Sequence, residues 1–332
     1  MNTGMTTTLA RFRYPFPMLK NPFAEQLQDI TDNQWIDGEY LYLYEDDPDI
    51  RHTYKKTKTA HIASQWFPTA SLERLKPVCR FMLWTLYNDD MYEEGPLSKV
   101  KLVHEKSISV LCGELAAEEA GIPLASLLAC LRSELLQFIP VESLHHFIAA
   151  LNKYFNGLEQ ELTYKEKKTF PTIEECIAIR ENSLCLFPFL ELMDLETKLP
   201  LPTDIYNHPV IQRLKALASR MMVYYNEVQS VRKDEATGSI YYNLVKVIQH
   251  NRNISLEEAC LEDLRIHNED LKEFIHLQMS LPDFGEWHDA VVNRIHYISM
   301  TLSGWKNVSA KMDRYNTIDG FPSAETVKKV AS

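Results

Sequence analysis

The feature that most constrains the fold of this chain is the spacing of its apolar residues, which recur close to every 3.6 residues along most of the sequence. That spacing is typical of amphipathic helices, and no segment shows the sustained period-two alternation of a strand. Glycine is scarce, at 10 of 332 residues, which also favours helices over glycine-rich β folds. Breaks between helices are predicted at Pro68, residues 95–96 and 121–123, Pro171, residues 200–202, Gly238, residues 282–285 and Gly320. The sequence therefore predicts an all-α protein.

The helical pattern forms one uninterrupted domain. A length of 332 residues would allow two domains of roughly 150 residues each, but no internal repeat and no Ser/Gly-rich linker divides the chain. Residues 1–22 are rich in proline and aromatic residues and are predicted to form an extended arm rather than a helix. We therefore expect an arm at 1–22, a helical domain at 23–315 and a C-terminal tail at 316–332.

Charge and cysteine usage exclude several functions. The formal charge is −11, from 35 basic and 46 acidic residues, so the chain lacks the basic surface of a nucleic-acid-binding protein. The six cysteines show no C-x-x-C spacing and are predicted to be reduced core residues. No apolar stretch reaches 18 residues, and the N-terminus lacks the apolar core of a signal peptide. These observations predict a cytoplasmic protein without stable membrane insertion.

An acidic cluster ends the apolar segment that begins at residue 79. Met82, Leu86, Asp89 and Glu93 follow at helical offsets that put them on one face, and Asp90 follows Asp89 directly. Carboxylates at the inner end of a core-facing stripe require a compensating cation, and oxygen ligands favour magnesium or manganese. The alternative is a solvated helix end with no ligand.

A second polar pattern occurs at residues 221–235. Asn226, Ser230 and Asp234 are spaced by four residues, which aligns an amide oxygen, a hydroxyl and a carboxylate along one helical face. Such a set can bind one hard cation. The alternative is the polar surface of an ordinary amphipathic helix.

Together the two patterns resemble the class I terpene synthases of the microbial, single-domain type. Members of that family carry a D-D-x-x-[DE] motif and, further along, an N-x-x-x-S-x-x-x-E triad. Arg180, which lies 46 residues before Asn226, resembles the family's diphosphate-sensing arginine. Lys233 and the pair Arg314 and Tyr315 also agree with the family pattern. The resemblance implies helices arranged around a central apolar active-site cavity.

This sequence departs from the family pattern at three places. The third triad residue is Asp234, where glutamate is usual, so the carboxylate is one methylene shorter. The acidic motif can end at Glu93 or at Glu94, and the shared face with Asp89 favours Glu93. The tryptophan expected six residues before the Arg-Tyr pair falls at Val308, and Trp305 lies one turn earlier.

The resemblance implies magnesium-assisted loss of diphosphate from a prenyl diphosphate, followed by cyclisation of the carbocation. Three magnesium ions, with manganese as an alternative, would bind Asp89, Asp90 and Glu93 on one side and Asn226, Ser230 and Asp234 on the other. The residues implied for diphosphate binding and catalysis are Arg180, Lys233, Arg314 and Tyr315. Those implied for the rest of the substrate site are Ser183, Leu184, Phe81, Trp84, Leu86 and Trp305, with Phe187 and Phe189 as further aromatic candidates.

Aromatic faces stabilise a cation, although core packing is the alternative for each of these rings. A helix break is predicted at Pro188, near Ser183 and Leu184. The arm at 1–22 and the tail at 316–332 are predicted to close over the site.

Farnesyl diphosphate, which would give a sesquiterpene, is slightly preferred as the substrate over geranylgeranyl diphosphate. Leu86, where many relatives have an aromatic residue, would leave room for the longer chain. A chain-elongating prenyl diphosphate synthase should carry two D-D-x-x-D strings, and this sequence has no second one. A non-catalytic helical binding protein is the other alternative. The resemblance also allows a homodimer.

Overall fold

A computed structural model of the chain describes residues 3–44, 47–92 and 95–312, and within these ranges all regular structure is helical, as the sequence predicts. The first half contains α1 (Thr3–Arg11), α2 (Ala24–Ile30), a π-helix η1 (Thr31–Glu39), a 3₁₀ turn η2 (Leu41–Tyr44), α3 (Pro48–Thr57), α4 (Thr59–Trp66), α5 (Leu72–Tyr92), α6 (Leu97–Cys112), α7 (Ala117–Ala120), α8 (Ala125–Leu135) and α9 (Val141–Lys167). The second half contains α10 (Ile173–Ser183), α11 (Leu186–Glu191), α12 (Asp194–Thr197), α13 (Thr203–Tyr206), α14 (Pro209–Thr237), α15 (Leu244–Arg252), α16 (Leu256–Met279), η3 (Gly285–Trp287) and α17 (His288–Ser309).

The predicted breaks coincide with the ends of helices. Gly238 terminates α14 in a left-handed conformation with φ 78°, which costs glycine little because it has no Cβ. Pro171 lies between α9 and α10, and residues 282–285 lie between α16 and α17. Gly320 and the tail at 316–332 lie outside the described residues.

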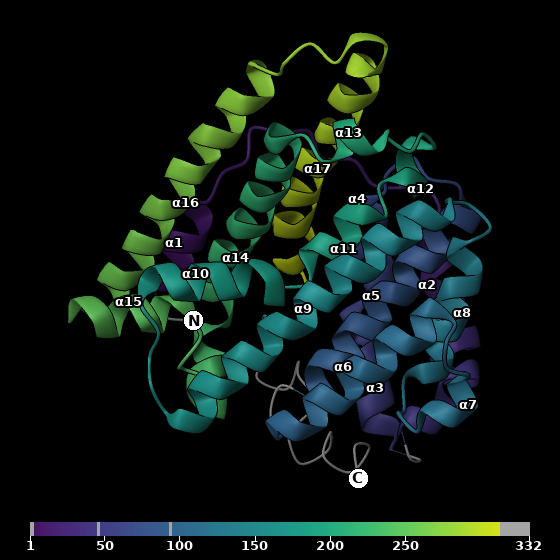
Figure 1. Ribbon diagram of the computed structural model, residues 1–332. Coiled ribbons are helices and arrows are strands. Elements are labelled where there is room, and N and C mark those ends of the chain that lie inside the picture. Colours follow the sequence, from purple (N-terminus) through teal and green to yellow (C-terminus); the bar gives the residue numbers. More distant parts are fainter. Residues whose placement is uncertain (1–2, 45–46, 93–94, 313–332) are drawn as a thin grey trace.

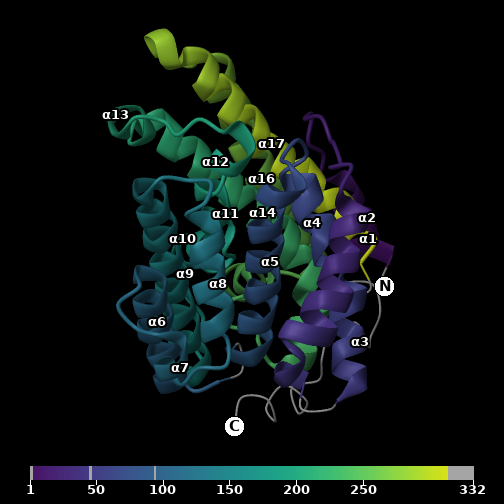
Figure 2. The ribbon, with the colours of Figure 1, turned by 90° about the vertical axis from the view of Figure 1, so that its right-hand side faces the viewer.

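Long helices surround the centre of the molecule. In Figures 1 and 2, α5, α9 and α14 lie around the middle, with α6 and α8 outside α5 and α9. Helices α4 and α17 pack together on the side nearer the N-terminus, and α16 packs on the outer face of α14. The core is continuous, and its large buried side chains include Trp84, Phe147 and Phe155. This packing leaves inner faces of α4, α5, α9, α14 and α17 around one central space.

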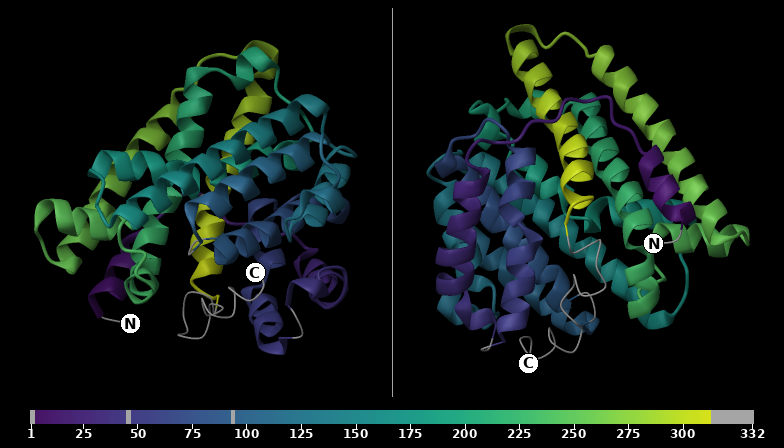
Figure 3. Two further views of the ribbon diagram at one scale, coloured as in Figure 1. Left: turned by 60° about the horizontal axis from the view of Figure 1, so that its bottom comes forward. Right: turned by 180° about the vertical axis from the view of Figure 1, so that it is seen from behind.

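The N-terminal arm differs from its prediction. Residues 3–11 form helix α1, which packs on α14 and α16, whereas the sequence favoured an extended chain. Threonine and glycine give this segment a low helix propensity, so tertiary contacts decide its conformation. Residues 12–22 are irregular, as expected, and cross the outside of α17 (Figure 3). Two hydrogen bonds hold the arm in place. Ser303 Oγ donates to Phe16 O (3.1 Å), and Tyr14 Oη donates to Met221 O (3.1 Å).

The cysteines are all free, as predicted, but they are not all core residues. Cys79, Cys176, Cys185 and Cys260 are buried, whereas Cys112 is exposed at the end of α6. None of the helices in the described ranges combines the length and apolar character that spanning a membrane requires.

Candidate active site

One cavity opens among the inner helix faces, with an empty volume of about 1190 Å³ that includes its open mouth. Helices α4, α5, α9, α10, α11, α14 and α17 all contribute to its wall. The wall has an apolar part and a polar part. The apolar part includes Ile62, Met82, Leu86, Leu158, Leu162, Leu184 and Met222.

The acidic end of α5 forms one polar wall. Met82, Leu86 and Asp89 all line the cavity, so the predicted common face is confirmed for these three of its four residues. Asp90 is not among the lining residues, because it is turned towards α3, where Tyr54 Oη donates a hydrogen bond to Asp90 Oδ2 (2.8 Å). Glu93 and Glu94 lie outside the described residues.

Helix α14 forms the facing polar wall. Its start is fixed by Pro209 in the first turn, and its 29 residues carry Asn226, Ser230 and Asp234 into the lining of the cavity. Ser230 Oγ donates to Asp234 Oδ2 (2.8 Å). Lys233 also lines the cavity. The structure thus brings the predicted triad and Asp89 to one space.

These donors suit a hard divalent cation. Asp89 and Asp234 supply carboxylate oxygens, Asn226 an amide oxygen and Ser230 a hydroxyl, and oxygen ligands are those that magnesium prefers. Within residues 3–44, 47–92 and 95–312 no three His, Cys, Asp or Glu side chains gather closely enough to hold an ion by themselves. A cation bound here would therefore depend on the amide and the hydroxyl as well as on the carboxylates.

Arg180 lines the cavity from α10 and is held by two buried carboxylates that sequence analysis missed. Its Nη1 lies 2.5 Å from Glu161 Oε1 on α9, and its Nη2 lies 2.7 Å from Glu227 Oε1 on α14. Burial alone would lower the pKa of the guanidinium, but the two carboxylates more than offset this and raise that pKa. Burial raises the pKa of Glu227 to about 7 despite the nearby Arg180. No short motif could have revealed these partners, because they come from other helices.

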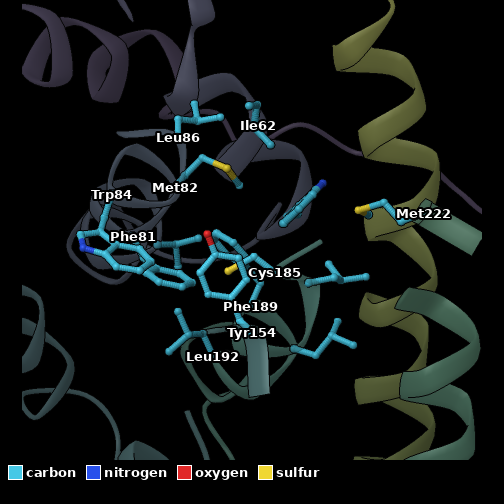
Figure 4. Close-up of a cluster of buried hydrophobic side chains, with 14 of the residues drawn as sticks. Ile62, Phe81, Met82, Trp84, Leu86, Tyr154, Cys185, Phe189, Leu192 and Met222 are labelled. Atoms are coloured by element: carbon cyan, nitrogen blue, oxygen red, sulfur yellow. The ribbon is translucent and has the colours of Figure 1, made fainter. Parts of the chain in front are cut away.

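Two of the predicted aromatic residues belong to the core instead of the cavity wall. Phe81 and Trp84 stack at 5.6 Å between ring centroids, and neither lines the cavity. In Figure 4 they lie beyond Phe189 and Tyr154 as seen from Met222. Successive side chains of a helix are rotated by about 100° around its axis. Phe81, one residue before Met82, and Trp84, two residues after it, therefore point away from the face of Met82.

Other rings do line the cavity. Phe189 and Trp305 lie in its wall, as predicted, and sequence analysis missed Trp66, Tyr92, Tyr154 and Tyr242. Phe187 is half-buried beside Lys153, whose Nζ lies 5.9 Å from the ring centroid, and it does not line the cavity. Arg314 and Tyr315 lie outside the described residues.

The helix break near Arg180 comes earlier than predicted. Helix α10 ends at Ser183, and Cys185 adopts a left-handed conformation with φ 66°. Pro188 lies inside the first turn of α11, where a missing N–H leaves no hydrogen bond unmade. Ser183 and Leu184 line the cavity at this break.

Comparison with known proteins agrees with this geometry. A family model described as terpene synthase family 2, C-terminal metal binding, matches residues 80–273. Germacrene A synthase of Nostoc punctiforme is 27% identical over 86% of this chain and 87% of its own length. The (+)-T-muurolol synthase of Roseiflexus castenholzii, named as cyclising (2E,6E)-farnesyl diphosphate, is 26% identical over 86% and 85%.

Solved structures show the same fold. Germacradien-4-ol synthase from Streptomyces citricolor superimposes with a TM-score of 0.77, covering 90% of this chain and 97% of that one at 18% identity. The SVS_A2 protein from ancestral sequence reconstruction superimposes with a TM-score of 0.81, covering 90% and 89% at 16% identity.

Proposed function

This chain belongs to terpene synthase family 2, and from that premise we propose that it ionises farnesyl diphosphate and cyclises the resulting cation to a sesquiterpene. The observation that carries the proposal is that Asp89 and the triad of Asn226, Ser230 and Asp234 face one cavity whose remaining wall is apolar and aromatic. The relative from Roseiflexus castenholzii, whose name includes (2E,6E)-farnesyl diphosphate, supports the choice of chain length.

The polar walls bind the diphosphate end of the substrate. Asp89 on α5 and the triad on α14 would hold three magnesium ions, with Asp90 and Glu93 as the remaining acidic residues of the motif. These ions would supply positive charge to the departing diphosphate oxygens. Arg180 and Lys233 line the same cavity and would donate hydrogen bonds to those oxygens, as would Arg314 and Tyr315.

The apolar walls bind and fold the prenyl chain. As the carbon–oxygen bond breaks, its electron pair leaves with the diphosphate and the allylic carbon becomes cationic. Ring faces of Phe189, Trp305 and Tyr154 stabilise that charge, and the surrounding aliphatic side chains exclude water. The arm at 1–22 and the tail at 316–332 would close the mouth of the cavity, and the active protein would form a homodimer.

The test is to incubate purified protein and magnesium with geranyl, farnesyl or geranylgeranyl diphosphate and to analyse the extracts by gas chromatography with mass detection. We expect a cyclic hydrocarbon or alcohol from farnesyl diphosphate. Asn226→Ala should abolish product and diphosphate release, whereas Asn251→Ala, on the outer helix α15, should retain both.

Other outcomes would contradict the proposal. A cyclic product only from geranylgeranyl diphosphate would move the assignment to a diterpene synthase. Longer diphosphates formed only after addition of isopentenyl diphosphate would indicate chain elongation.

A further inference from the structure

Asn243 is a buried residue next to the triad that no sequence motif identified. It precedes α15, is completely buried and does not line the cavity. Its Nδ2 donates hydrogen bonds to Asp234 Oδ2 (2.7 Å) and to Glu227 O (3.1 Å), both on α14. Its Oδ1 accepts a hydrogen bond from Lys246 N (3.3 Å) and so caps α15.

These contacts fix the orientation of the amide. A rotation by 180° would bring Oδ1 against the carboxylate of Asp234 and against a backbone carbonyl, where acceptor would face acceptor. It would also place an NH₂ group against the N–H of Lys246. The NH₂ group therefore faces α14.

The hydrogen bond from Asn243 acts on two residues of the triad together. Asp234 Oδ2 accepts hydrogen bonds both from Asn243 Nδ2 and from Ser230 Oγ. Asn243 Nδ2 also donates a longer hydrogen bond to Ser230 Oγ (3.4 Å). Because the hydroxyl hydrogen of Ser230 is directed to Asp234, a lone pair of its oxygen remains for a cation. A carboxylate anchored in this way has a fixed rotamer, which matters here because an aspartate reaches one methylene less far than the glutamate usual at this position.

We propose that Asn243 is a positioning residue that holds Asp234 and Ser230 in the geometry needed to bind a divalent cation. The inference rests on the proposed function, because it takes the triad to be the cation site. Groups that orient metal ligands from behind typically change metal affinity by 10- to 100-fold when they are removed.

The test separates this role from the capping of α15. Serine and aspartate are both good N-cap residues, so Asn243→Ser and Asn243→Asp keep the cap. Serine cannot reach Asp234, and aspartate would present a negative oxygen to it. Asn243→Ser should fold with a melting temperature in the absence of metal close to that of the wild type. Asn243→Asp places a second carboxylate against Asp234 in a buried position, so it should fold with a lower melting temperature.

Metal binding is measured without turnover, by titrating Mg²⁺ in the presence of inorganic diphosphate and following heat or thermal stabilisation. We expect Asn243→Ser to raise the midpoint Mg²⁺ concentration roughly tenfold or more, and Asn243→Asp to raise it further. In an Asp234→Ala background, Asn243→Ser should add much less than it does in the wild type, because only the longer contact of Asn243 with Ser230 remains to be lost. The matched control is Asn251→Ser, within α15, whose amide donates hydrogen bonds to the backbone carbonyls of Pro171 and Val247. Its midpoint should stay at the wild-type value.

Two results would overturn the inference, and they are distinguishable. If Asn226→Ala raises the midpoint and Asn243→Ser leaves it within twofold of the wild type, Asn243 does not position the ligands. If Asn226→Ala also leaves the midpoint unchanged, the cation does not bind at the triad, and the proposed function fails together with the inference.

Discussion

At the scale of single residues, the main electrostatic feature is the pairing of Arg180 with Glu161 and Glu227. All three side chains are almost inaccessible to solvent, with exposed fractions of 12%, 6% and 1%. Ser183 Oγ also donates to Glu161, so the cluster is tied to the end of α10. Removing one partner from such a cluster leaves buried charge without compensation, which is costly, whereas replacing the whole cluster by neutral groups is not.

Arg180→Met should therefore lower the free energy of unfolding by roughly 3–5 kcal/mol. Adding Glu161→Gln and Glu227→Gln to this variant should recover a large part of the loss, because no unpaired charge remains. Urea unfolding without metal measures both. Arg265→Met is the control, since the exposed ion pairs of Arg265 should contribute less than about 1 kcal/mol. Equal stability of Arg180→Met and the triple variant would contradict the argument.

A buried carboxyl group makes stability depend on pH. Asp263 on α16 is completely buried, and neither of its oxygens has a hydrogen-bond partner among the residues that the structure describes. Burial raises its pKa well above the ordinary value of 3.8, and the nearby Glu227 and Glu262 add to the shift. The folded protein thus keeps a proton that the unfolded chain releases as the pH rises above about 4. This contribution to stability is complete at low pH and is lost with increasing pH.

His267, one turn along α16, acts in the opposite direction. Burial lowers its pKa from 6.5 to about 4, so its contribution to stability is lost as the pH falls through that interval. Between about pH 4 and 6.5 the two groups change the free energy of unfolding in opposite directions as the pH rises. Above pH 6.5 His267 is neutral in both states, and only the destabilisation due to Asp263 continues.

Asp263→Asn should become more stable than the wild type as the pH increases, because it removes the ionisation of the unfolded state. The difference should grow by up to about 1.4 kcal/mol per pH unit as the pH rises above the ordinary carboxyl pKa of 3.8. Urea unfolding at a series of pH values measures it. A difference that is independent of pH would show that Asp263 is ionised in the folded protein.

At the scale of elements, the approach of α10 to α9 determines the shape of the cavity near Arg180. A Cβ atom on Gly157 of α9 would lie 2.8 Å from Ser183 N, which is closer than real Cβ atoms pack, and a tight 3.0 Å from Ser183 Cβ. Gly157 therefore allows the end of α10 to rest on the backbone of α9. This contact sets the position of Ser183 and, three residues earlier, of Arg180.

Gly157→Ala should force the two helices apart and lower the free energy of unfolding by about 1–3 kcal/mol, the range typical of overpacking. It should also reduce the rate of diphosphate release, because Arg180 and Ser183 are displaced. Gly38→Ala in η1 is the control. A Cβ there meets no atom closer than 3.8 Å, so this variant should be neutral or slightly stabilised. Urea unfolding and assays of diphosphate release on both variants provide the comparison.

Helix ends could be predicted where their cause is local. Gly238 needs its left-handed conformation whatever surrounds it, and proline interrupts the pattern at 200–202 for reasons contained in the residue itself. The break at Cys185 could not be predicted in the same way, because a non-glycine residue adopts φ 66° there only under tertiary constraint. The same reason explains α1, whose weak intrinsic propensity is overridden by packing on α14 and α16.

At the scale of the whole molecule, the arm connects the beginning of the chain with its last helices. Phe12 is completely buried, and its ring packs edge-on against the rings of Tyr225 on α14 and His267 on α16. The distances between ring centroids are 5.4 Å and 4.7 Å. Lys306 of α17 donates a hydrogen bond to the carbonyl of Phe12. A short segment thus contacts three helices from the second half of the sequence.

Phe12→Ala should lower the free energy of unfolding by about 3–5 kcal/mol, the usual range for a buried phenylalanine. Leu19→Ala, in the same arm but 47% exposed, should change it by less than about 0.5 kcal/mol. Differential calorimetry of both variants tests the argument. Similar melting temperatures for the two would show that the arm does not contribute to the stability of the folded domain.

The candidate site divides in the same way into parts that could and could not be predicted. Asp89 and the triad follow from spacing along single helices, and the fold brings them to one cavity. Glu161 and Asn243 could not be identified, because their roles arise from contacts between α9 and α10 and between α14 and α15. Phe81 and Trp84 were misassigned because composition indicates an aromatic wall but not which ring faces inward.

The arm also determines the order of events while the protein is being made. Lys306 and Phe12 are separated by 294 residues, so the anchor of the arm leaves the ribosome long after the arm itself. At roughly 5–20 residues per second, synthesis of the intervening chain takes about 15–60 s. During that time Phe12 has no complete docking site, and the apolar residues around it are available to chaperones or to other nascent chains. Docking of the arm then closes a loop almost as long as the protein, a step of large sequence separation in a helical fold whose other contacts are mostly local.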